Sequence, residues 1–336
     1  MAQAILLVGG FGTRLMPLTN AVPKPMLPIA GLPVTEHQLA MAKRAGITSL
    51  VLATSYLSDV FIPYFGDGSR WGMKLQYAVE EEPLGTGGAI RNAAQLLTKS
   101  ESIVIFNGDV LSSHDLSKQI RMHESLDADV TMHLTHVADA RAFGCVPIDD
   151  EGRVTAFLEK MEKPVTNTIN AGCYVFNPRI IDSIPENKVV SVEREIFPRL
   201  VADGQAIYGM VDDSYWLDIG TPKALLQSSV DVVRGIASQG ALDGVPLVHL
   251  SMAYIAHEGA VIETGAIVTG GSAIGRGARV GVGALVDASI VSEGAIVMAG
   301  AKIRNSFVAS HASVSSQLSI EDSFISGGEV VSLLPL

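Results

Sequence analysis

The chain has 336 residues, which corresponds to about two domains of ordinary size. Its 24 Lys and Arg and 35 Asp and Glu give a net charge of −11 without any long basic run, so we expect it to bind neither nucleic acid nor an anionic membrane. With 48% hydrophobic and 18% charged residues it is too apolar to be disordered, yet no stretch approaches the roughly 20 apolar residues of a membrane helix.

The N-terminal third alternates short apolar runs with helical patterns. Strands are predicted over 4–8, 50–53, 75–79 and 103–106, and helices over 34–45, 57–65 and 88–97. This alternation predicts a parallel sheet that is covered by helices on both faces. The first apolar run ends in glycines and lacks the basic region and cleavage site of a signal peptide, so we interpret it as a strand and expect a cytoplasmic protein.

The middle of the chain gives a mixed pattern. Strands are predicted over 129–134, 154–157 and 172–176, followed by helices over 193–202 and 222–238. A stretch at 240–246 that contains Gly and Pro predicts a linker. The two cysteines, Cys145 and Cys173, form neither a disulfide framework nor a zinc motif, in keeping with a reducing compartment.

The tail from residue 251 differs in kind, because its apolar residues recur at a spacing of six with three steps of five. These residues are Ile262, Val268, Ile274, Val280, Val286, Val291, Val297, Ile303, Val308, Val314, Ile320, Ile325 and Val331. Neither a helix nor an ordinary strand has this period, so the tail predicts short strands separated by corners and stacked as a hexapeptide β-helix. The shorter steps recur every 17 residues, which indicates one shortened corner in each three-sided coil.

A glycine-rich turn follows the first predicted strand. The segment from Gly9 to Met26 reads GGFGTRLMPLTNAVPKPM; it lacks the GxxxxGK[ST] pattern of a P-loop, and Leu15 occupies the last glycine position of GxGxxG. Backbone N–H groups of such a turn can approach a phosphate closely, and Arg14 and Lys24 add fixed positive charges. The segment therefore predicts a site for a triphosphate.

This segment resembles the signature GGxGTRLxPLTxxxPKPM of the sugar-1-phosphate nucleotidyltransferases. The form VGGFGTRL and the later EEPLGTGGA are most similar to the mannose-1-phosphate guanylyltransferases. Further matching segments extend over essentially the whole chain: FGDGSRWG, FNGD, FGCV, FLEKMEKP, NAGCYVF, VEREIFP and YWLDIGTP. Met16 departs from the pattern, since the guanylyltransferases usually carry Arg there.

The resemblance implies an α/β fold, in which a Rossmann-like mixed or parallel sheet forms a nucleotidyltransferase domain and a left-handed parallel β-helix follows. The corresponding boundaries are a catalytic domain over 1–235, a linker over 236–250 and the β-helix over 251–336. The end coils of such a stack need covering, so we expect the tail to assemble a homo-oligomer, a dimer or tetramer, and not to take part in the chemistry.

The family transfers a nucleotidyl group from an NTP to a sugar 1-phosphate, giving an NDP-sugar and pyrophosphate. A sugar phosphate oxygen attacks the α-phosphorus in line, so the protein acts by positioning and charge neutralisation. The resemblance implies that Arg14 holds the triphosphate, Lys24 contacts the reacting phosphates and Lys160 binds the sugar phosphate. It also implies that Asp109 and Asp218 hold Mg²⁺, which takes one or two protein carboxylates.

Two sets of binding residues follow from the resemblance. The nucleotide is expected at Val8, Gly9, Gly10, Gly12, Thr13, Glu80, Glu82, Gly85, Thr86, Asn107 and Gly108. The sugar phosphate is expected at Gly144, Glu159, Lys160, Asn170 and Gly172. Side chains alternate along extended backbone, so Glu159 and Lys160 are expected to point apart, one toward the sugar and the other toward its phosphate. For Glu193, structural pairing at a helix start and sugar contact are both open.

Three consecutive glutamates leave the third predicted strand where the resemblance places the nucleobase. One carboxylate can accept hydrogen bonds from both N1–H and the N2 amine of guanine, whereas adenine presents an unprotonated N1 at that edge. Alternation puts Glu80 and Glu82 on one face and Glu81 on the other. We therefore expect GTP as donor and favour Glu80 as the reader, with Glu82 as second choice.

The favoured function is synthesis of GDP-mannose from GTP and mannose 1-phosphate. The same chemistry is open to a heptose, cyclitol or glucose 1-phosphate, and to ATP, UTP or dTTP. A second class is a non-catalytic regulatory subunit that senses nucleotide sugars, against which the complete set of charged residues argues. A third is an acyltransferase that uses His311 in the tail, for which the sequence carries no acceptor-site signature.

Overall fold

The structure is a computed structural model that describes all residues except 1, 11, 21, 55–57, 99–100 and 334–336. It contains two compact units, each made of two pieces of the chain. Unit 1 comprises Met1–Gly10 and Gln38–Trp216, and unit 2 comprises Phe11–His37 and Leu217–Leu336. None of the described helices combines the length and the apolar character that crossing a membrane requires.

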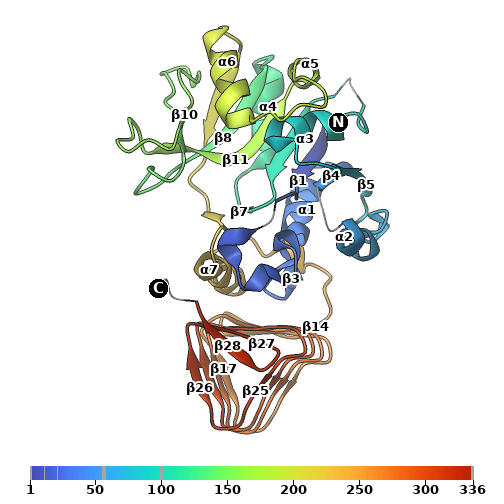
Figure 1. Cartoon of the computed structure of the whole chain (residues 1–336), viewed down its shortest axis with the longest axis vertical. Helices are drawn as coiled ribbons and strands as arrows, with labels where there is room; N and C mark the ends of the chain where they lie inside the picture. Colours follow the sequence, from blue (N-terminus) through green and yellow to red (C-terminus); the bar gives the residue numbers. More distant parts are fainter. Residues whose placement is uncertain (1, 11, 21, 55–57, 99–100, 334–336) are drawn as a thin grey trace. The chain divides into compact units, whose positions relative to one another are not determined.

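Unit 1 is built on a mixed sheet with the strand order β10-β9-β11-β6-β1-β4-β5, extended by β8 on β11 and β12 on β8 (Figure 1). β1 runs parallel to β4 and β6, whereas β11 runs antiparallel to β6. The strands are β1 (Gln3–Leu7), β4 (Ser49–Thr54), β5 (Lys74–Val79), β6 (Ile103–Asn107), β8 (Val130–His136), β9 (Gly144–Cys145), β10 (Leu158–Glu159), β11 (Thr168–Phe176) and β12 (Ile207–Val211), and a short strand, β7 (Val110–Ser112), follows β6.

Apolar side chains of the central strands and the covering helices form the core of unit 1. Ile5, Val51 and Ile105 on the parallel strands are fully buried, and Phe197 packs its ring 5.0 Å from that of Tyr174. The helices are α1 (Val34–Arg44, shared with unit 2), α2 (Ser58–Phe65), α3 (Gly85–Ala94), α4 (Leu116–Ser125), α5 (Pro178–Asp182) and α6 (Phe197–Ala202), with a π-helical turn at Val192–Ile196 directly before α6.

The predicted strands of the parallel part are confirmed to within one residue by β1, β4, β5 and β6. α3 begins at Gly85 and not at 88, and Gly85 and Gly87 in its first turn pack closely against Val190. The predicted strand over 154–157 is wrong: there only Val154 forms a single bridge, with Ile148. The predicted helix over 57–65 starts at a residue outside the described ones and is otherwise present as α2.

In unit 2 a hairpin of β2 (Pro28–Ile29) and β3 (Leu32–Pro33) follows the signature segment. Later in the chain come β13 (Trp216–Asp218), which straddles the unit boundary, and α7 (Pro222–Val233). The helix predicted over 222–238 is thus confirmed up to residue 233. Its first turn is capped by Thr221, whose hydroxyl accepts a hydrogen bond from the N–H of Ala224 at 3.2 Å.

Residues 254–326 of unit 2, called the coil stack below, form three parallel sheets, β15-β18-β21-β24-β27, β16-β19-β22-β25 and β17-β20-β23-β26 (Figure 1). Paired residues are one coil apart, as for Val280 with Val297. This arrangement is consistent with the predicted β-helix. The strands are β14 (Leu247–Leu250), β15 (Tyr254–His257), β16 (Val261–Ile262), β17 (Ile267–Thr269), β18 (Ser272–Ile274), β19 (Arg279–Val280), β20 (Leu285–Asp287), β21 (Ile290–Val291), β22 (Ile296–Val297), β23 (Lys302–Arg304), β24 (Phe307–Val308), β25 (Ser313–Val314), β26 (Ser319–Glu321), β27 (Ser323–Ser326) and β28 (Glu329–Ser332).

The predicted Ile and Val repeat lines the inside of the coil stack from Ile262 to Ile325. The shortened corners hold one residue in the left-handed region, at Ala288, Asn305 and Asp322, with φ of 45°, 42° and 46°. The prediction that Val331 continues the buried repeat is wrong. Val331 is 39% exposed on β28, which turns back antiparallel to β27 and ends the stack.

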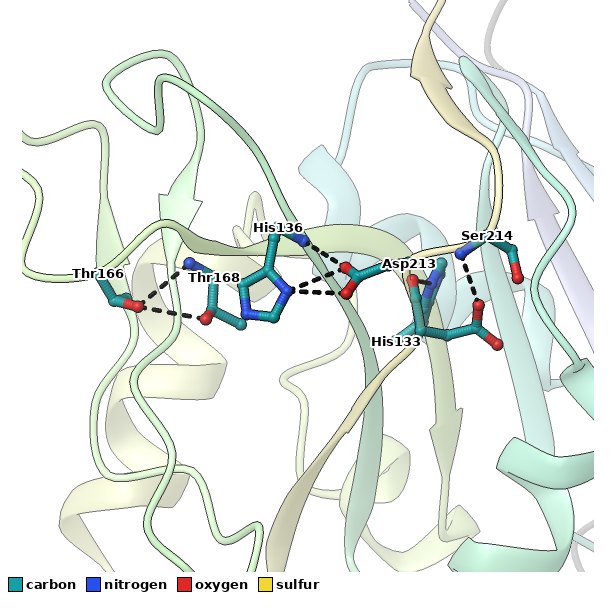
Figure 2. A network of polar contacts seen from close by, with 7 residues as sticks. His133, His136, Thr166, Thr168, Asp213 and Ser214 are labelled. Atoms are coloured by element: carbon teal, nitrogen blue, oxygen red, sulfur yellow. Dashed lines mark hydrogen bonds and ion pairs between the residues drawn. The ribbon is translucent and has the colours of Figure 1, made fainter.

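A polar network joins β8 to the segment after β12 in unit 1 (Figure 2). The ring Nδ1 of His136 lies 3.0 Å from both carboxylate oxygens of Asp213. His133 Nε2 lies 3.4 Å from the Asp212 carbonyl, and its ring stacks on that of His114 with centroids 3.8 Å apart. Burial lowers the pKa of His114 to about 4 and that of His133 to about 3, so both rings are neutral at pH 7.

We predict that this stacked pair makes folding sensitive to acid. Above pH 6.5 the two rings are neutral in both states; below it the unfolded chain takes up protons that the folded chain accepts only near pH 4 and pH 3. The free energy of unfolding therefore falls as the pH drops through this window, by on the order of a few kcal/mol. His133→Phe keeps a stacked ring that cannot titrate, so urea unfolding between pH 7 and pH 4 should lose stability less steeply than in the wild type. Equal slopes would contradict the assignment.

Candidate functional site

The signature segment lies in unit 2 and turns sharply at Gly12. Gly12 has φ of 59°, and a Cβ placed there would lie 3.0 Å from Thr19 Cγ2 and 3.2 Å from Lys24 Cβ. The Thr19 hydroxyl donates a hydrogen bond to the Gly12 carbonyl at 3.0 Å. Only glycine fits this turn without strain, and the turn packs directly against the base of the Lys24 side chain.

Arg14 and Asp218, far apart in the sequence, converge on Gly220 within unit 2. A Cβ on Gly220 would lie 2.8 Å from Arg14 Nη1 and 2.9 Å from Asp218 Oδ1. Arg14 itself is exposed and is held between Thr13 and the buried Leu15 in a short 3₁₀ turn, Thr13–Leu15. Unit 2 thus brings together a guanidinium and a carboxylate from two motifs that the sequence analysis singled out.

In unit 1 the ends of β1 and β6 approach each other at Gly108. The Gly108 N–H donates to the Leu7 carbonyl at 2.9 Å, and a Cβ on Gly108 would lie only 2.2 Å from the same oxygen. Val8 is buried, whereas Gly9 and Gly10 are exposed beyond the strand end. Asp109, half-buried, occupies the turn between β6 and β7. In such a sheet, ligands usually bind at the carboxyl ends of adjacent parallel strands.

Glu80 follows β5 and is half-buried. Its Oε2 accepts a hydrogen bond from the Leu84 N–H at 3.2 Å, while Oε1 is buried without a hydrogen-bond partner among the residues that the structure describes. Burial raises the pKa of the Glu80 carboxyl. Glu82 is exposed, and the expected alternation does not reach it because β5 ends at Val79.

The loop after Glu80 is fixed by its approach to residues 190–193. Gly85 has φ of 71°, and a Cβ there would lie 2.6 Å from the Val190 carbonyl oxygen. The Thr86 hydroxyl donates to Glu193 Oε2 at 2.8 Å and accepts from the Val192 N–H at 2.9 Å. Of the two interpretations left open for Glu193, these contacts favour structural pairing.

The strand pair β9 and β10 brings Gly144 opposite Glu159. A Cβ on Gly144 would lie 2.9 Å from Glu159 Oε2. Lys160 leaves extended backbone with φ of 49°, and its Nζ lies 3.7 Å from Glu159 Oε1. The expectation that the two side chains point apart is therefore wrong, because it assumed that the strand continues through Lys160.

Asn170, Gly172 and Asn107 meet around a buried tyrosine that the sequence analysis did not single out. Asn170 Nδ2 donates to the Tyr174 hydroxyl at 2.6 Å, and Asn170 Oδ1 accepts from the Gly172 N–H at 3.0 Å. A Cβ on Gly172, whose φ is 77°, would lie 3.0 Å from Asn107 Nδ2. Burial raises the pKa of Tyr174 well above its ordinary value. The motif NAGCY contains Tyr174, but only the fold shows that its hydroxyl accepts a hydrogen bond from Asn170.

Trp216, from the motif YWLDIGTP, is a second residue that the sequence analysis quoted without giving it a role. Its ring N–H donates to the Ala171 carbonyl at 2.9 Å, and the ring meets that of Phe143 edge-on at 5.4 Å. It therefore fixes β11 beside the β9 end, next to Gly172.

The predicted site residues fall into two sets. Gly12, Thr13, Arg14, Lys24 and Asp218 belong to unit 2, and the others belong to unit 1. No group of three or more His, Cys, Asp or Glu side chains able to hold a metal ion occurs in the described part of the chain. Chemically, the two sets offer cations for phosphate oxygens, a half-buried carboxylate at the end of β5, and Asp109 and Asp218 as hard oxygen donors.

Comparisons with known proteins identify the family of the chain. Residues 3–235 match the family model described as nucleotidyl transferase. The chain is 53% identical over 261 residues to a mannose-1-phosphate guanylyltransferase of Mycobacterium tuberculosis, covering 77% of this chain and 71% of the relative. It is 37% identical to a probable mannose-1-phosphate guanylyltransferase 1 of Oryza sativa, covering 77% and 73%.

Among solved structures, HddC from Yersinia pseudotuberculosis complexed with GMP-PN is similar, with a TM-score of 0.58, 30% identity, and coverage of 68% of this chain and 98% of that one. The family model spans more than half of the chain, and both relatives are matched over more than two thirds of their length. The chain therefore belongs to the nucleotidyltransferases that act on sugar 1-phosphates.

Proposed function

We propose that the protein is a mannose-1-phosphate guanylyltransferase, which makes GDP-mannose and pyrophosphate from GTP and mannose 1-phosphate. The observation that carries the proposal is the 53% identity to the Mycobacterium tuberculosis enzyme of that name. The half-buried Glu80 carboxylate supports the choice of nucleotide. The choice of mannose 1-phosphate rests on the names of the relatives and not on a contact in this chain.

In the proposed reaction an oxygen of the sugar phosphate attacks the α-phosphorus of GTP, and the bond to the β-phosphate breaks as pyrophosphate leaves. Lys24 neutralises charge on the reacting phosphates, and Arg14 clamps the leaving pyrophosphate with its planar guanidinium. Lys160 binds the phosphate of the incoming sugar, and Glu159 and Asn170 contact the sugar. The contact between Glu159 and Lys160 at 3.7 Å supports a shared sugar-phosphate pocket, since the pair can open toward a ligand without breaking a strong bond.

Asp109 and Asp218 are the residues that we propose for Mg²⁺. Carboxylate oxygens are the ligands that this ion prefers, and two of them leave room for phosphate oxygens and water. Asp218 is a fitting donor because its Oδ1 borders Gly220, as does the guanidinium of Arg14, the residue proposed for the same polyphosphate. When bound, the ion would offset negative charge on the phosphates.

Glu80 is the proposed reader of guanine, with Glu82 as the weaker candidate. Its Oε1 is buried and has no hydrogen-bond partner among the described residues, which costs free energy unless a ligand supplies a donor. The N1–H and N2 amine of guanine are such donors, and the N1 of adenine is not. Val8, Gly9, Gly10, Gly85, Thr86, Asn107 and Gly108 complete the proposed nucleotide site, together with Gly12 and Thr13, and Gly144 and Gly172 complete the sugar site.

Several broader expectations stay proposals. We propose that the coil stack is a left-handed β-helix. We also propose that residues 1–235 form the catalytic domain and 251–336 the tail, joined by a linker over 236–250, and that the chain forms a dimer or tetramer in the cytoplasm.

The test of the central proposal is pyrophosphate release measured over a matrix of NTPs and sugar 1-phosphates. GTP with mannose 1-phosphate is expected to give the highest kcat/KM. A preference for another pair would move the substrate assignment, and no turnover with any pair would favour a sensing subunit.

We predict that Asp109→Asn and Asp218→Asn each remove most Mg²⁺-dependent turnover while the protein stays folded. Losing one metal carboxylate costs several kcal/mol of transition-state stabilisation, which is roughly 100-fold or more in kcat. Asp139→Asn, which removes an exposed carboxylate paired with Arg141, is the control and should leave turnover unchanged. Wild-type activity in either of the first two variants, with unchanged Tm, would refute the metal assignment.

We predict that Glu80→Gln lowers kcat/KM for GTP by about tenfold or more and leaves that for ATP unchanged or higher. The neutral amide accepts only through one oxygen and presents N–H groups toward the N–H donors of guanine. Glu82→Gln tests the second candidate: Glu82 is exposed two residues away, so if Glu80 is the reader, both nucleotides should react with this variant as with the wild type. If base preference follows Glu82, that residue is the reader in place of Glu80; if it follows neither residue, the guanine argument fails while the nucleotidyl-transfer proposal stands.

A further inference from the structure

A buried histidine of the coil stack contacts the hairpin that follows Lys24. His257, at the end of β15, points its Nε2 to the Ala30 carbonyl oxygen at 2.7 Å and is 5% exposed. Ala30 and Gly31 form the turn between β2 and β3. A Cβ on Gly31 would lie 2.1 Å from His257 Nε2, so the imidazole packs directly against the backbone of the turn.

The same turn is held from a second side by α7. The Ala30 N–H donates to the Ser229 hydroxyl at 2.9 Å, and this bond is buried. Ala30 has φ of 49°, a conformation that costs a residue with a Cβ free energy unless its surroundings hold it. Both backbone polar groups of Ala30 are therefore fixed by unit 2 elements more than 190 residues later in the sequence.

The turn is tightly connected to Lys24. The Leu27 N–H donates to the Lys24 carbonyl at 3.1 Å, and the Val34 N–H donates to the Leu27 carbonyl at 3.1 Å. The Thr35 hydroxyl donates to the Pro25 carbonyl at 3.1 Å. Only five residues separate Lys24 from Ala30, and these bonds close the hairpin onto itself. A shift of the turn is therefore passed on to the Lys24 backbone.

We propose that the coil stack positions Lys24 through the contact of His257 with the Ala30–Gly31 turn. The tail then has a part in catalysis that is separate from assembly, in contrast to the expectation from sequence. His257 is a positioning residue: it acts through the hairpin on a lysine that contacts the reacting phosphates. The proposal rests on the proposed function only for the role of Lys24.

The hydrogen bond from His257 to the Ala30 carbonyl determines which substitutions of His257 test the proposal. A carbonyl oxygen can only accept, so Nε2 must carry the proton and donate it. Burial lowers the pKa of His257, which keeps the ring in this neutral form. Leucine fills similar volume without a donor, whereas glutamine can place an amide N–H near the position of Nε2. His257→Leu therefore removes the hydrogen bond, and His257→Gln retains it.

The experiment compares full-length wild type, His257→Leu and His257→Gln with His249→Leu as matched control. His249 lies on β14, which pairs with β15 of the coil stack, and its ring stacks on that of Tyr254 with centroids 4.0 Å apart. It makes a hydrogen bond to Ser251 and is not part of the hairpin contact. Assays use the NTP and sugar 1-phosphate that the wild type prefers, together with Tm and amide hydrogen exchange of peptides that span residues 24–33.

We expect His257→Leu to lower kcat by about tenfold with a smaller change in the KM values, because the lysine is displaced at the reacting centre. Exchange in residues 24–33 should become faster. His257→Gln should recover most of kcat, and His249→Leu should match the wild type in kcat and in exchange. A folded His257→Leu protein with wild-type kcat and exchange would overturn the proposal.

Ser229→Ala covers the case in which His257→Leu does not fold. It removes the other hydrogen bond to Ala30 with loss of one oxygen atom, and it should lower kcat and speed exchange in the same peptides, less strongly than His257→Leu. Wild-type kcat and exchange in Ser229→Ala would then overturn the proposal. The exchange readout does not depend on the reaction, so a failed assignment of substrates and a failed positioning role give different results.

Discussion

The candidate site residues depend on positions where neighbouring atoms lie too close for any residue other than glycine. At Gly108 the end of β6 comes so near the end of β1 that a Cβ would lie 2.2 Å from the Leu7 carbonyl oxygen. At Gly220 the space is filled by Arg14 and Asp218. Because these glycines fix where the chain runs, they also fix the direction of the polar residues beside them, Asn107 and Asp109 in unit 1 and Asp218 in unit 2. The backbone thus sets the direction of these candidate site residues.

The candidate site residues differ in how deeply they are buried. Glu80 is held half-buried with one oxygen bonded to the Leu84 N–H, and the raised pKa of its carboxyl reflects the free energy spent on taking it out of water. Arg14 and Lys160 are exposed, so they can reach a ligand that arrives with several negative charges. In a chain of net charge −11, the signature segment from Gly9 to Met26 carries Arg14 and Lys24 and no acidic residue.

The sequence contained most of the fold, because the period of apolar residues reports directly which face is buried. Strand β1 and the repeat from Ile262 to Ile325 could be predicted for this reason. Predictions failed where a local rule met a change of backbone conformation. Lys160 was expected to alternate with Glu159, but it adopts the left-handed region, and Val331 continues the repeat in sequence although β28 reverses direction. The role of Tyr174 could not be predicted, since it depends on Asn170 and Asn107 meeting around one hydroxyl.

The hairpin after Lys24 needs a rigid neighbour, and the coil stack provides one. Its core is a column of Ile and Val in which each coil is paired with the next, so a coil cannot shift without disturbing both of its neighbours. Buried serines stand one coil apart at 272, 289, 306 and 323. The backbone N–H groups of the last three donate to the hydroxyl of the serine one coil earlier, at 3.1, 3.1 and 3.2 Å. A hydrogen bond from a flexible tail would leave Ala30 free to move with it. The bond from His257 restrains Ala30 because its donor belongs to the first coil of a stack in which each coil is paired with the next.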